Sequence, residues 1–310
     1  MRVTVVGAGY VGLALCRRLA AAGHQVTGVR RSPEPVREAG IDAVAADVTD
    51  PETLTALPDA DAVVFAASSG GRGPEPARRV FVDGLENTIH EYAGRGSTPE
   101  RLVYTSSTGV YGDHDGDWVD EETPLDPQTE KTAVLAEAER VAVETAADAG
   151  IDGTVARFAG LYGPDRYRLE RYVNGPVTQG YLNMLHRDDA AGAVRFLLTG
   201  ESPPEDDTPD TPRSSPADHA RGGVVTVVDD EPVEKWTFAD WLADECDAAR
   251  PEKRTKAERI AAGELSAAAR RRIRTSKRVD NAKLRELGYE FRFPTFRSGY
   301  RDAVEAYTDG

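Results

Sequence analysis

Short runs of β-branched residues alternate with longer runs rich in Ala, Leu and Arg over the first two-thirds of the chain. Each short run is bounded by turn residues and followed by enough residues for a helical crossover, so we interpret it as a strand. The predicted strands have the sequences VTVVGA, QVTGVR, AVAAD, AVVFAAS, RLVYTSS and GTVARFA. This alternation predicts an α/β fold, a doubly wound parallel sheet of the Rossmann type with helices on both faces.

The pattern changes near residue 174. We predict that residues 1–173 form the sheet domain and that residues 174–310 form a small C-terminal lobe whose segments interleave with the main sheet. Residues 201–222 are rich in Pro, Asp and Ser and almost devoid of apolar residues, which predicts a mobile acidic loop. Strand character resumes directly afterwards in VVTVVDD, so we do not interpret this loop as a linker between independent domains.

The charge balance bears on whether nucleic acid is a partner and on the salt concentration in which the protein works. The chain has 310 residues, with 53 Asp and Glu against 38 Lys and Arg, a net charge of −15. A phosphate backbone requires clustered Lys and Arg, so the acidic excess argues against nucleic acid as a partner. Arg strongly outnumbers Lys and carboxylates are spread along the chain, a pattern that favours adaptation to a high-salt cytoplasm. The alternative is an ordinary acidic soluble protein.

Membrane, disulfide and metal chemistry are not expected. No apolar stretch approaches the roughly 20 residues that span a bilayer, and the chain enters a strand at once, which leaves no room for a targeting segment. We therefore expect a cytoplasmic protein. Only Cys16 and Cys246 are present, and the five His residues show no metal-ligand spacing, so neither a disulfide framework nor a metal site is predicted.

The strongest motif is GAGYVG, which follows the first predicted strand and opens the first predicted helix. Its first Gly would permit a tight turn, its second would let the backbone approach a pyrophosphate, and its third would allow close packing of helix on strand. The motif predicts a dinucleotide-binding site, with a purely structural glycine turn as the alternative. The cofactor-binding residues predicted here are Gly7, Gly9, Tyr10, Val11 and Gly12.

Two arginines indicate which dinucleotide to expect. The second predicted strand ends at Arg30 and Arg31, where an acidic residue would bind the ribose 2′-hydroxyl of NAD and an Arg accommodates the 2′-phosphate of NADP. Both arginines therefore predict a preference for NADP(H) over NAD(H). The alternative is that one or both are solvated surface residues.

The chain resembles the extended short-chain dehydrogenase/reductases, in particular the NAD-dependent epimerase/dehydratases, over nearly its whole length. Besides the glycine turn, the resemblance rests on the segments ADVTD, FAAS, VDGLEN, LVYTSSTGVYG, RFAGLYGP and LHRDDAA. It implies that Ser107 is the catalytic Ser, which hydrogen-bonds the reacting hydroxyl or carbonyl. From the residues alone, Ser107 can also be a strand-end hydroxyl that caps the backbone.

The resemblance also implies roles for other residues. Asp47 would lie near the adenine. The complete set of further cofactor-binding residues that it implies is Asp47, Val48, Ala66, Ala67 and Ser68. The residues that it places around the substrate lobe are Arg157, Tyr162 and His186.

One departure from the family puts catalysis in question. The family mechanism uses a Tyr four residues before a Lys on one helix, and no Tyr in this chain has that partner. The family's helix continues with a Glu four residues beyond the Lys, and taking Glu137 as that Glu puts Ala133 at the Lys position and Thr129 at the Tyr position. A Thr hydroxyl is far less acidic than a phenol, so Thr129 cannot simply replace Tyr. Lys131 would approach the site only in a different register, and no phenol accompanies it.

These observations predict an NAD(P)-dependent oxidoreductase or epimerase that acts on a nucleotide-sugar or a similar small hydroxyl or carbonyl compound. Tyr111, Tyr162 and His186 are the alternative groups for moving the proton. The second hypothesis is a non-catalytic NADP(H)-binding sensor or regulatory protein, which the missing Tyr-Lys pair favours. The identity of the substrate stays open, and so does the oligomeric state, with a homodimer as the commonest arrangement.

Overall fold

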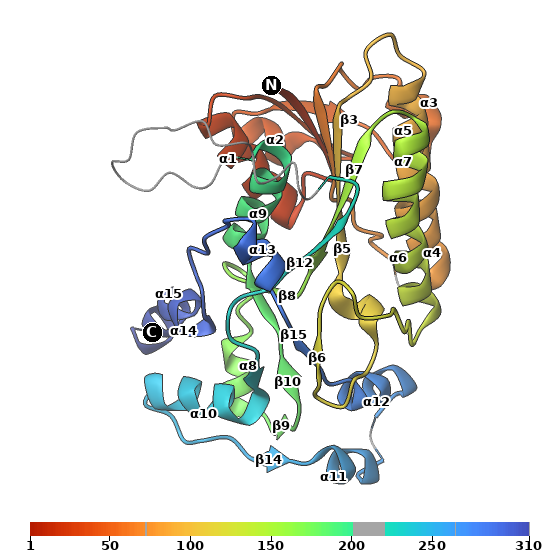
Figure 1. The fold of residues 1–310 in the computed structure, drawn as a ribbon. Helices are drawn as coiled ribbons and strands as arrows, with labels where there is room; N and C mark the ends of the chain where they lie inside the picture. Colours follow the sequence, from red (N-terminus) through yellow and green to blue (C-terminus); the bar gives the residue numbers. More distant parts are fainter. Residues whose placement is uncertain (72, 201–220, 264, 310) are drawn as a thin grey trace.

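The computed structural model describes residues 1–71, 73–200, 221–263 and 265–309. Its centre is a seven-stranded sheet in the order β12-β7-β5-β4-β1-β2-β3, and all neighbouring strands are parallel (Figure 1). This order confirms the predicted doubly wound α/β fold, because the chain winds outwards in both directions from β1. The strands are β1 (Arg2–Val6), β2 (Gln25–Arg30), β3 (Asp42–Ala45), β4 (Ala62–Phe65), β5 (Arg101–Ser107), β7 (Asp152–Phe158) and β12 (Val224–Val227).

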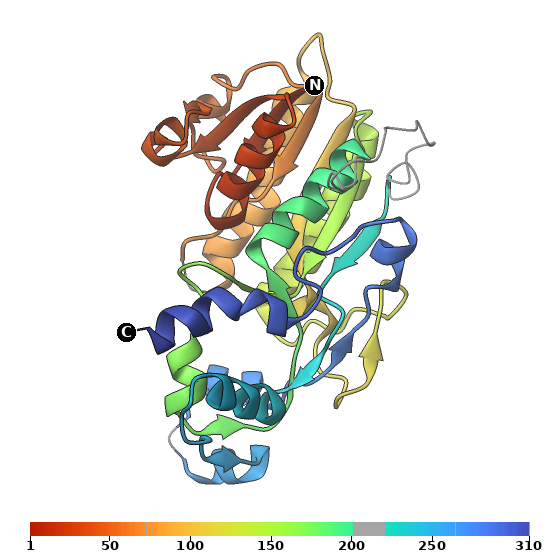
Figure 2. The ribbon, with the colours of Figure 1, turned by 90° about the vertical axis from the view of Figure 1, so that its left-hand side faces the viewer.

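Helices cover both faces of this sheet (Figures 1 and 2). On one face α1 packs against α9, and their apolar side chains share a core with the strand residues Val3 and Val5. On the other face α5 and α6 share a core with Phe65 and Tyr104. Successive strand residues point to opposite faces, so a run of buried apolar residues supplies both cores. The four helices are α1 (Tyr10–Ala21), α5 (Gly84–Ala93), α6 (Glu130–Arg140) and α9 (Arg187–Thr199).

A smaller lobe lies beyond one end of the sheet (Figure 1). Its core is largely aromatic: Phe238, Phe296 and Tyr300 are buried there, and the rings of Tyr162 and Tyr300 stack with centroids 4.9 Å apart. The elements of the lobe are α8 (Leu169–Asn174), β9 (Val177–Thr178), β10 (Tyr181–Leu182), β13 (Val233–Glu234), α10 (Lys235–Glu245), β14 (Lys253–Arg254), α11 (Lys256–Ala261), α12 (Ala267–Arg274), α14 (Phe296–Gly299) and α15 (Arg301–Thr308).

The second half of the chain contributes to the sheet as well as to the lobe. The strand β12, formed by the run VVTVVDD, pairs with β7 at the edge of the sheet, and α9 packs on the sheet beside α1. The segment predicted to be a mobile acidic loop, 201–222, lies outside the described residues except for its last two. Among the helices of the described residues, none is long and apolar enough to cross a membrane.

Short elements complete the connections. Two π-helical turns, η1 and η3, continue α4 and α6, and η2 is a single 3-10 turn directly after β5. These elements are α2 (Glu34–Glu38), α3 (Pro51–Leu54), α4 (Pro74–Arg78), η1 (Arg79–Asp83), η2 (Thr108–Tyr111), β6 (Trp118–Val119), η3 (Val141–Thr145), α7 (Ala146–Asp148), β8 (Gly160–Tyr162), β11 (Met184–His186), β15 (Arg278–Val279) and α13 (Ala282–Glu286).

Candidate functional site

A cleft of about 950 Å³ opens at the carboxyl ends of the sheet strands, beside the point where the strand order reverses between β1 and β4. Ligands bind at this position in open α/β sheets. The predicted site residues that line the cleft are Gly7, Gly9, Tyr10, Val11, Arg30, Arg31, Asp47, Val48, Ala66, Ala67, Ser68 and Ser107. The structure therefore brings the glycine turn, the arginine pair and the end of β5 together around one cavity.

The glycine turn has the geometry that a dinucleotide requires. Gly7 has a φ of +98°, and a Cβ on it would lie 2.3 Å from the backbone nitrogen of Ala67. A Cβ on Gly12 would lie 2.3 Å from the carbonyl oxygen of Gly7, so Gly12 lies behind the turn and lets α1 approach β1 closely. Gly9 is the N-cap of α1, and its nearest neighbour would be 3.9 Å from a Cβ. The cleft side of Gly9 is therefore open, at a helix N-terminus that favours phosphate.

Positive charge gathers at the end of the cleft formed by β2 and β3. Arg30 donates a hydrogen bond from Nη1 to the carbonyl oxygen of Ala8, 3.3 Å away, so it lies across the glycine turn. The backbone N–H and hydroxyl of Thr49, together with the Arg31 and Arg79 guanidiniums, hold the pKa of Asp47 below its usual value. Asp47 is thus ionised, with two arginines near it. These groups form a polar, cationic rim on which the ribose end of a dinucleotide would lie.

Sequence reasoning did not identify three arginines that also line the cleft: Arg79, Arg166 and Arg168. Arg166 stacks over the ring of Tyr10 at 4.0 Å, while the Tyr10 hydroxyl donates a hydrogen bond to the carbonyl oxygen of Pro164. Arg168 adopts a left-handed conformation with a φ of +57° directly before α8. Both lie just after β8, in a segment whose motif was recognised, but only the fold shows that this loop returns to the glycine turn.

Ser107 is the last residue of β5 and the N-cap of η2. Its Oγ accepts a hydrogen bond from the backbone N–H of Gly109 at 3.1 Å, which leaves the hydroxyl hydrogen able to donate into the cleft. The neighbouring Ser106 hydroxyl donates instead to Glu139, 2.6 Å away on α6. Of these two serines, Ser107 is the one whose hydroxyl is available to a ligand.

The register of α6 differs from the one expected from sequence. Glu139, not Glu137, faces the sheet: its carboxylate accepts from Arg157 Nη2 at 2.7 Å and from Arg157 Nε at 3.0 Å, and both side chains are 5% exposed. Glu137 pairs with Arg78 on the outer side of the helix. Residues four apart share a helix face, so the positions in line with Glu139 are Leu135 and Lys131, and both line the cleft.

This register corrects the role expected for Thr129. Thr129 is the N-cap of α6, where its hydroxyl accepts from the backbone N–H of Thr132 in a capping box. Neither Thr129 nor Ala133 is among the described residues that line the cleft. Thr129 therefore has a structural role at the start of the helix, and Lys131 lines the cleft instead.

The residues expected around the substrate do not reach the cleft lining either. Arg157 lies on β7 inside the sheet domain, where it pairs with Glu139 and donates to the Tyr111 hydroxyl at 2.9 Å. Burial raises the pKa of Tyr111 and of Tyr162, and burial lowers the pKa of His186 to about 4. The three alternative proton donors, Tyr111, Tyr162 and His186, are thus buried side chains of the sheet and lobe interiors.

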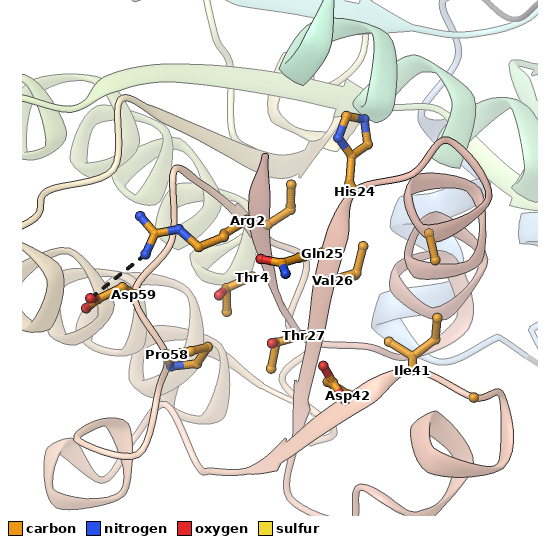
Figure 3. Close-up of a pocket in the computed structure, with 13 residues that line it drawn as sticks. Arg2, Thr4, His24, Gln25, Val26, Thr27, Ile41, Asp42, Pro58 and Asp59 are labelled. Carbon is orange, nitrogen blue, oxygen red and sulfur yellow. Dashed lines mark ion pairs between the residues drawn. The ribbon is translucent and has the colours of Figure 1, made fainter.

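A second hollow, of about 410 Å³, lies at the opposite ends of β1 and β2 (Figure 3). Arg2 pairs there with Asp59 at 3.9 Å and with Asp61 at 2.6 Å. Arg2, its main cation, is thus already matched by carboxylates. None of the predicted site residues lines this hollow, and it lies at the edge of the sheet away from the glycine turn. We therefore take the larger cleft as the candidate site.

Comparison with known proteins agrees with this geometry. The model of the NAD dependent epimerase/dehydratase family matches residues 3–202. Protein YeeZ of Escherichia coli K12 is 32% identical over 207 residues, which cover 64% of this chain and 73% of that protein.

Two solved structures align over almost the whole chain. A protein from Methylobacillus flagellatus, assigned to the NAD-dependent epimerase/dehydratases, is 28% identical with a TM-score of 0.73, and the alignment covers 100% of this chain and 99% of that one. The human epimerase family protein SDR39U1 (isoform 2), solved with NADPH, is 18% identical with a TM-score of 0.73, and the alignment covers 98% and 99% of the two chains. This second likeness concerns the fold alone.

Proposed function

The chain belongs to the NAD-dependent epimerase/dehydratase family, and we propose that it is an NADP(H)-preferring oxidoreductase or epimerase that acts on a nucleotide-sugar or a similar small hydroxyl or carbonyl compound. The observation that carries the proposal is that one cleft joins the open face of Gly9, the arginine pair and the Ser107 hydroxyl. In this proposal residues 1–173, together with α9 and β12, bind the nucleotide, and the lobe formed by the rest of residues 174–310 recognises the substrate.

The preference for NADP(H) rests on the charges at the rim. Arg30, Arg31 and Arg79 line the cleft close to the ends of β2 and β3, where a 2′-phosphate would add negative charge. Guanidinium groups bind phosphate through paired hydrogen bonds, and Asp47 is already engaged by Thr49. A 2′-phosphate would therefore meet cations, whereas the 2′-hydroxyl of NAD would give these arginines no anionic partner beyond Asp47.

The chain's own residues would perform the following tasks. The bound nicotinamide supplies or accepts a hydride, which is the chemistry that this cofactor brings. Ser107 donates its hydroxyl hydrogen to the substrate oxygen and thereby orients the reacting carbon. Leu135, on the face of α6 that lines the cleft, covers the reacting atoms from water with an apolar side chain.

The non-catalytic alternative has one observation in its favour. Leu135 occupies the position in which the family carries its Lys, and an apolar side chain cannot perform that electrostatic role. In this alternative the cleft binds NADP(H) and the chain acts as a redox sensor or regulatory partner. Reduction of a carbonyl compound by the purified chain would distinguish an enzyme from a sensor, because a sensor would bind NADPH without oxidising it.

The experiment that tests the proposal is a fluorescence titration with NADPH and NADH in parallel, in molar KCl. We expect tighter binding of NADPH, and we expect Arg30→Ala combined with Arg31→Ala to weaken NADPH far more than NADH. The matched control is Arg37→Ala, which removes an exposed Arg on α2 that does not line the cleft. Equal losses for the two nucleotides would remove the argument for NADP(H), and a folded chain that binds neither would overturn the proposed function.

The setting that we propose is the high-salt cytoplasm suggested by the charge count. Of the 38 basic residues only six are Lys, and the acidic residues number 53. Carboxylates keep a surface hydrated, and concentrated salt screens their mutual repulsion. This proposal is independent of the cofactor, and it determines the salt concentration at which every assay should be run.

A further inference from the structure

Lys131 occupies an unusual position for a lysine. It is the second residue of α6, whose N-cap is Thr129, and cations are disfavoured at a helix N-terminus because the helix dipole is positive there. No ion pair of Lys131 is found within the described residues, and its side chain is exposed to the cleft. Local helix preferences therefore do not explain the residue, whereas an interaction with a ligand in the cleft would.

The neighbours of Lys131 place it at the Ser107 end of the cleft. A Cβ built on Gly109 would lie 3.4 Å from Ser107 Oγ and 3.6 Å from the side-chain methyl carbon of Thr132, the residue next to Lys131. The first turn of α6 thus lies against the end of β5. Both Lys131 and Ser107 line the same cavity. A substrate oxygen hydrogen-bonded to Ser107 would therefore lie at the end of the cleft that Lys131 borders.

The other titratable side chains of the described cleft lining are engaged in hydrogen bonds or lie on other segments. Apart from arginines, which stay protonated, the titratable residues of the lining are Tyr10, Asp47, Glu75 and Lys131. Tyr10 donates to Pro164, Asp47 accepts from Thr49, and Glu75 lies in the first turn of α4. The arginines of the lining lie at or just after the end of β2, after β8 and at the start of η1: Arg30, Arg31, Arg79, Arg166 and Arg168.

We propose that Lys131 is the catalytic acid of this site, an inference that rests on the proposed function and names the group that moves the proton. Bound NADPH would supply the hydride that reduces the carbonyl carbon of the substrate, and would itself be oxidised to NADP⁺. The carbonyl oxygen, hydrogen-bonded to Ser107, takes a proton from Lys131 Nζ and becomes a hydroxyl. Solvent then returns a proton to the exposed amine. An alkoxide is far more basic than an amine, so the proton transfer is downhill.

The first test observes Lys131 by NMR and does not depend on turnover. The chain has six lysines, so labelling each amine with ¹³C-methyl groups gives a small set of NMR signals, and the signal lost in Lys131→Gln identifies Lys131. We expect this signal to shift on addition of NADP⁺ or NADPH, and to shift by different amounts with the two, because the nicotinamide ring of NADP⁺ carries a positive charge that NADPH lacks. Lys253, which pairs with Asp240 on the lobe, is the internal control and should not respond.

The outcomes are distinct. A Lys131 signal that stays unchanged while tryptophan fluorescence shows nucleotide binding overturns the role of Lys131 and leaves the proposed function intact. A folded chain that binds neither nucleotide overturns both. A Lys131 signal that shifts equally with both redox states shows a residue near the nucleotide but away from the nicotinamide, which also overturns the proposal.

The second test uses any carbonyl compound that the wild-type chain reduces with NADPH. We expect Lys131→Gln to lower kcat by about 10²-fold or more while NADPH affinity changes little, because the residue acts on the proton and not on the phosphates. Lys131→Arg keeps the charge but cannot release the proton, so it should be equally slow, and Lys131→Tyr should restore part of the rate. A full rate in Lys131→Arg would assign Lys131 to charge alone and overturn proton transfer.

Discussion

Glu139→Gln tests whether the buried pair with Arg157 determines how α6 faces the cleft. The Glu139 carboxylate accepts from Arg157 Nη2 at 2.7 Å, from Arg157 Nε at 3.0 Å and from Ser106 Oγ at 2.6 Å, and both charged side chains are 5% exposed. An amide would leave the guanidinium buried without its counter-charge. Removing one partner of a buried pair costs about 3–5 kcal/mol, so we expect the free energy of unfolding to fall by that amount.

The chain contains a matched control two residues away. Glu137 pairs with Arg78, and these side chains are 31% and 43% exposed. Exposed pairs contribute about 0–1 kcal/mol, so Glu137→Gln should change the free energy of unfolding by less than about 1 kcal/mol. Urea unfolding of both variants, followed by circular dichroism in molar KCl, measures the difference. Similar losses in the two variants would refute the structural assignment of Glu139 and, with it, the register that brings Lys131 and Leu135 to the cleft.

A double variant distinguishes a charge effect from a packing effect. Glu139→Leu together with Arg157→Met removes both charges at once and replaces them with apolar side chains of similar size. Such replacements of buried pairs are often neutral or stabilising, so the double variant should be more stable than Glu139→Gln alone. If the double variant loses as much stability as the sum of the losses in Glu139→Leu and in Arg157→Met, the pair contributes through shape rather than through charge.

Three further predictions concern the cleft, the pH dependence and the salt dependence. Gly12→Ala should abolish NADPH binding or prevent folding, because its Cβ would lie 2.3 Å from the Gly7 carbonyl oxygen, whereas Gly96→Ala, with nothing within 4 Å, should be silent in the same titration. Burial raises the pKa of Asp229, and the backbone N–H of Glu231, which favours the ionised carboxylate, does not offset this effect. The folded state therefore favours the protonated acid. This stabilises the fold at low pH, and the stabilisation is lost as the pH rises. Asp229→Asn should therefore add about 1–3 kcal/mol of stability at pH 8 and less at pH 5 in urea unfolding, and a loss at pH 8 would contradict this sign. Raising KCl from 0.1 to 2 M should raise Tm, because salt screens the repulsion behind a net charge of −15, and a fall in Tm would contradict the high-salt adaptation.

Local pattern was sufficient to predict the fold. The six predicted strands all belong to the seven-stranded sheet, because a buried parallel strand is a continuous apolar run that needs no knowledge of its neighbours. The glycine turn is local in part: Gly12 avoids a clash with the carbonyl oxygen of Gly7, five residues away, whereas Gly7 avoids the backbone of Ala67, which follows β4. The strands and the glycine spacing can be derived from a short window of sequence, but the close approach of Gly7 to Ala67 cannot.

The register of α6 could not be derived in this way. Glu137 and Glu139 stand two residues apart, about 200° around the helix, so choosing the wrong one turns the opposite face to the sheet. The sequence does contain a signal, since Arg157 interrupts an otherwise apolar strand and a buried Arg requires a buried acid. That signal indicates that Arg157 needs an acidic partner, but only the packing of α6 on β5 shows which carboxylate pairs with it.

The charges of the cleft bear on how a nucleotide would be held in concentrated salt. The lining carries six cationic side chains and only two acidic ones, within a chain whose net charge is −15. In dilute buffer the acidic surface would repel a dinucleotide phosphate at long range while the cleft attracts it. In molar salt the Debye length is about 3 Å, so both effects vanish beyond direct contact. Affinity must then come from contact geometry: the open backbone at Gly9, the N-terminus of α1 and paired hydrogen bonds from arginines. A site of this kind would retain its preference for NADPH across salt concentrations, because the contacts that distinguish the 2′-phosphate are short.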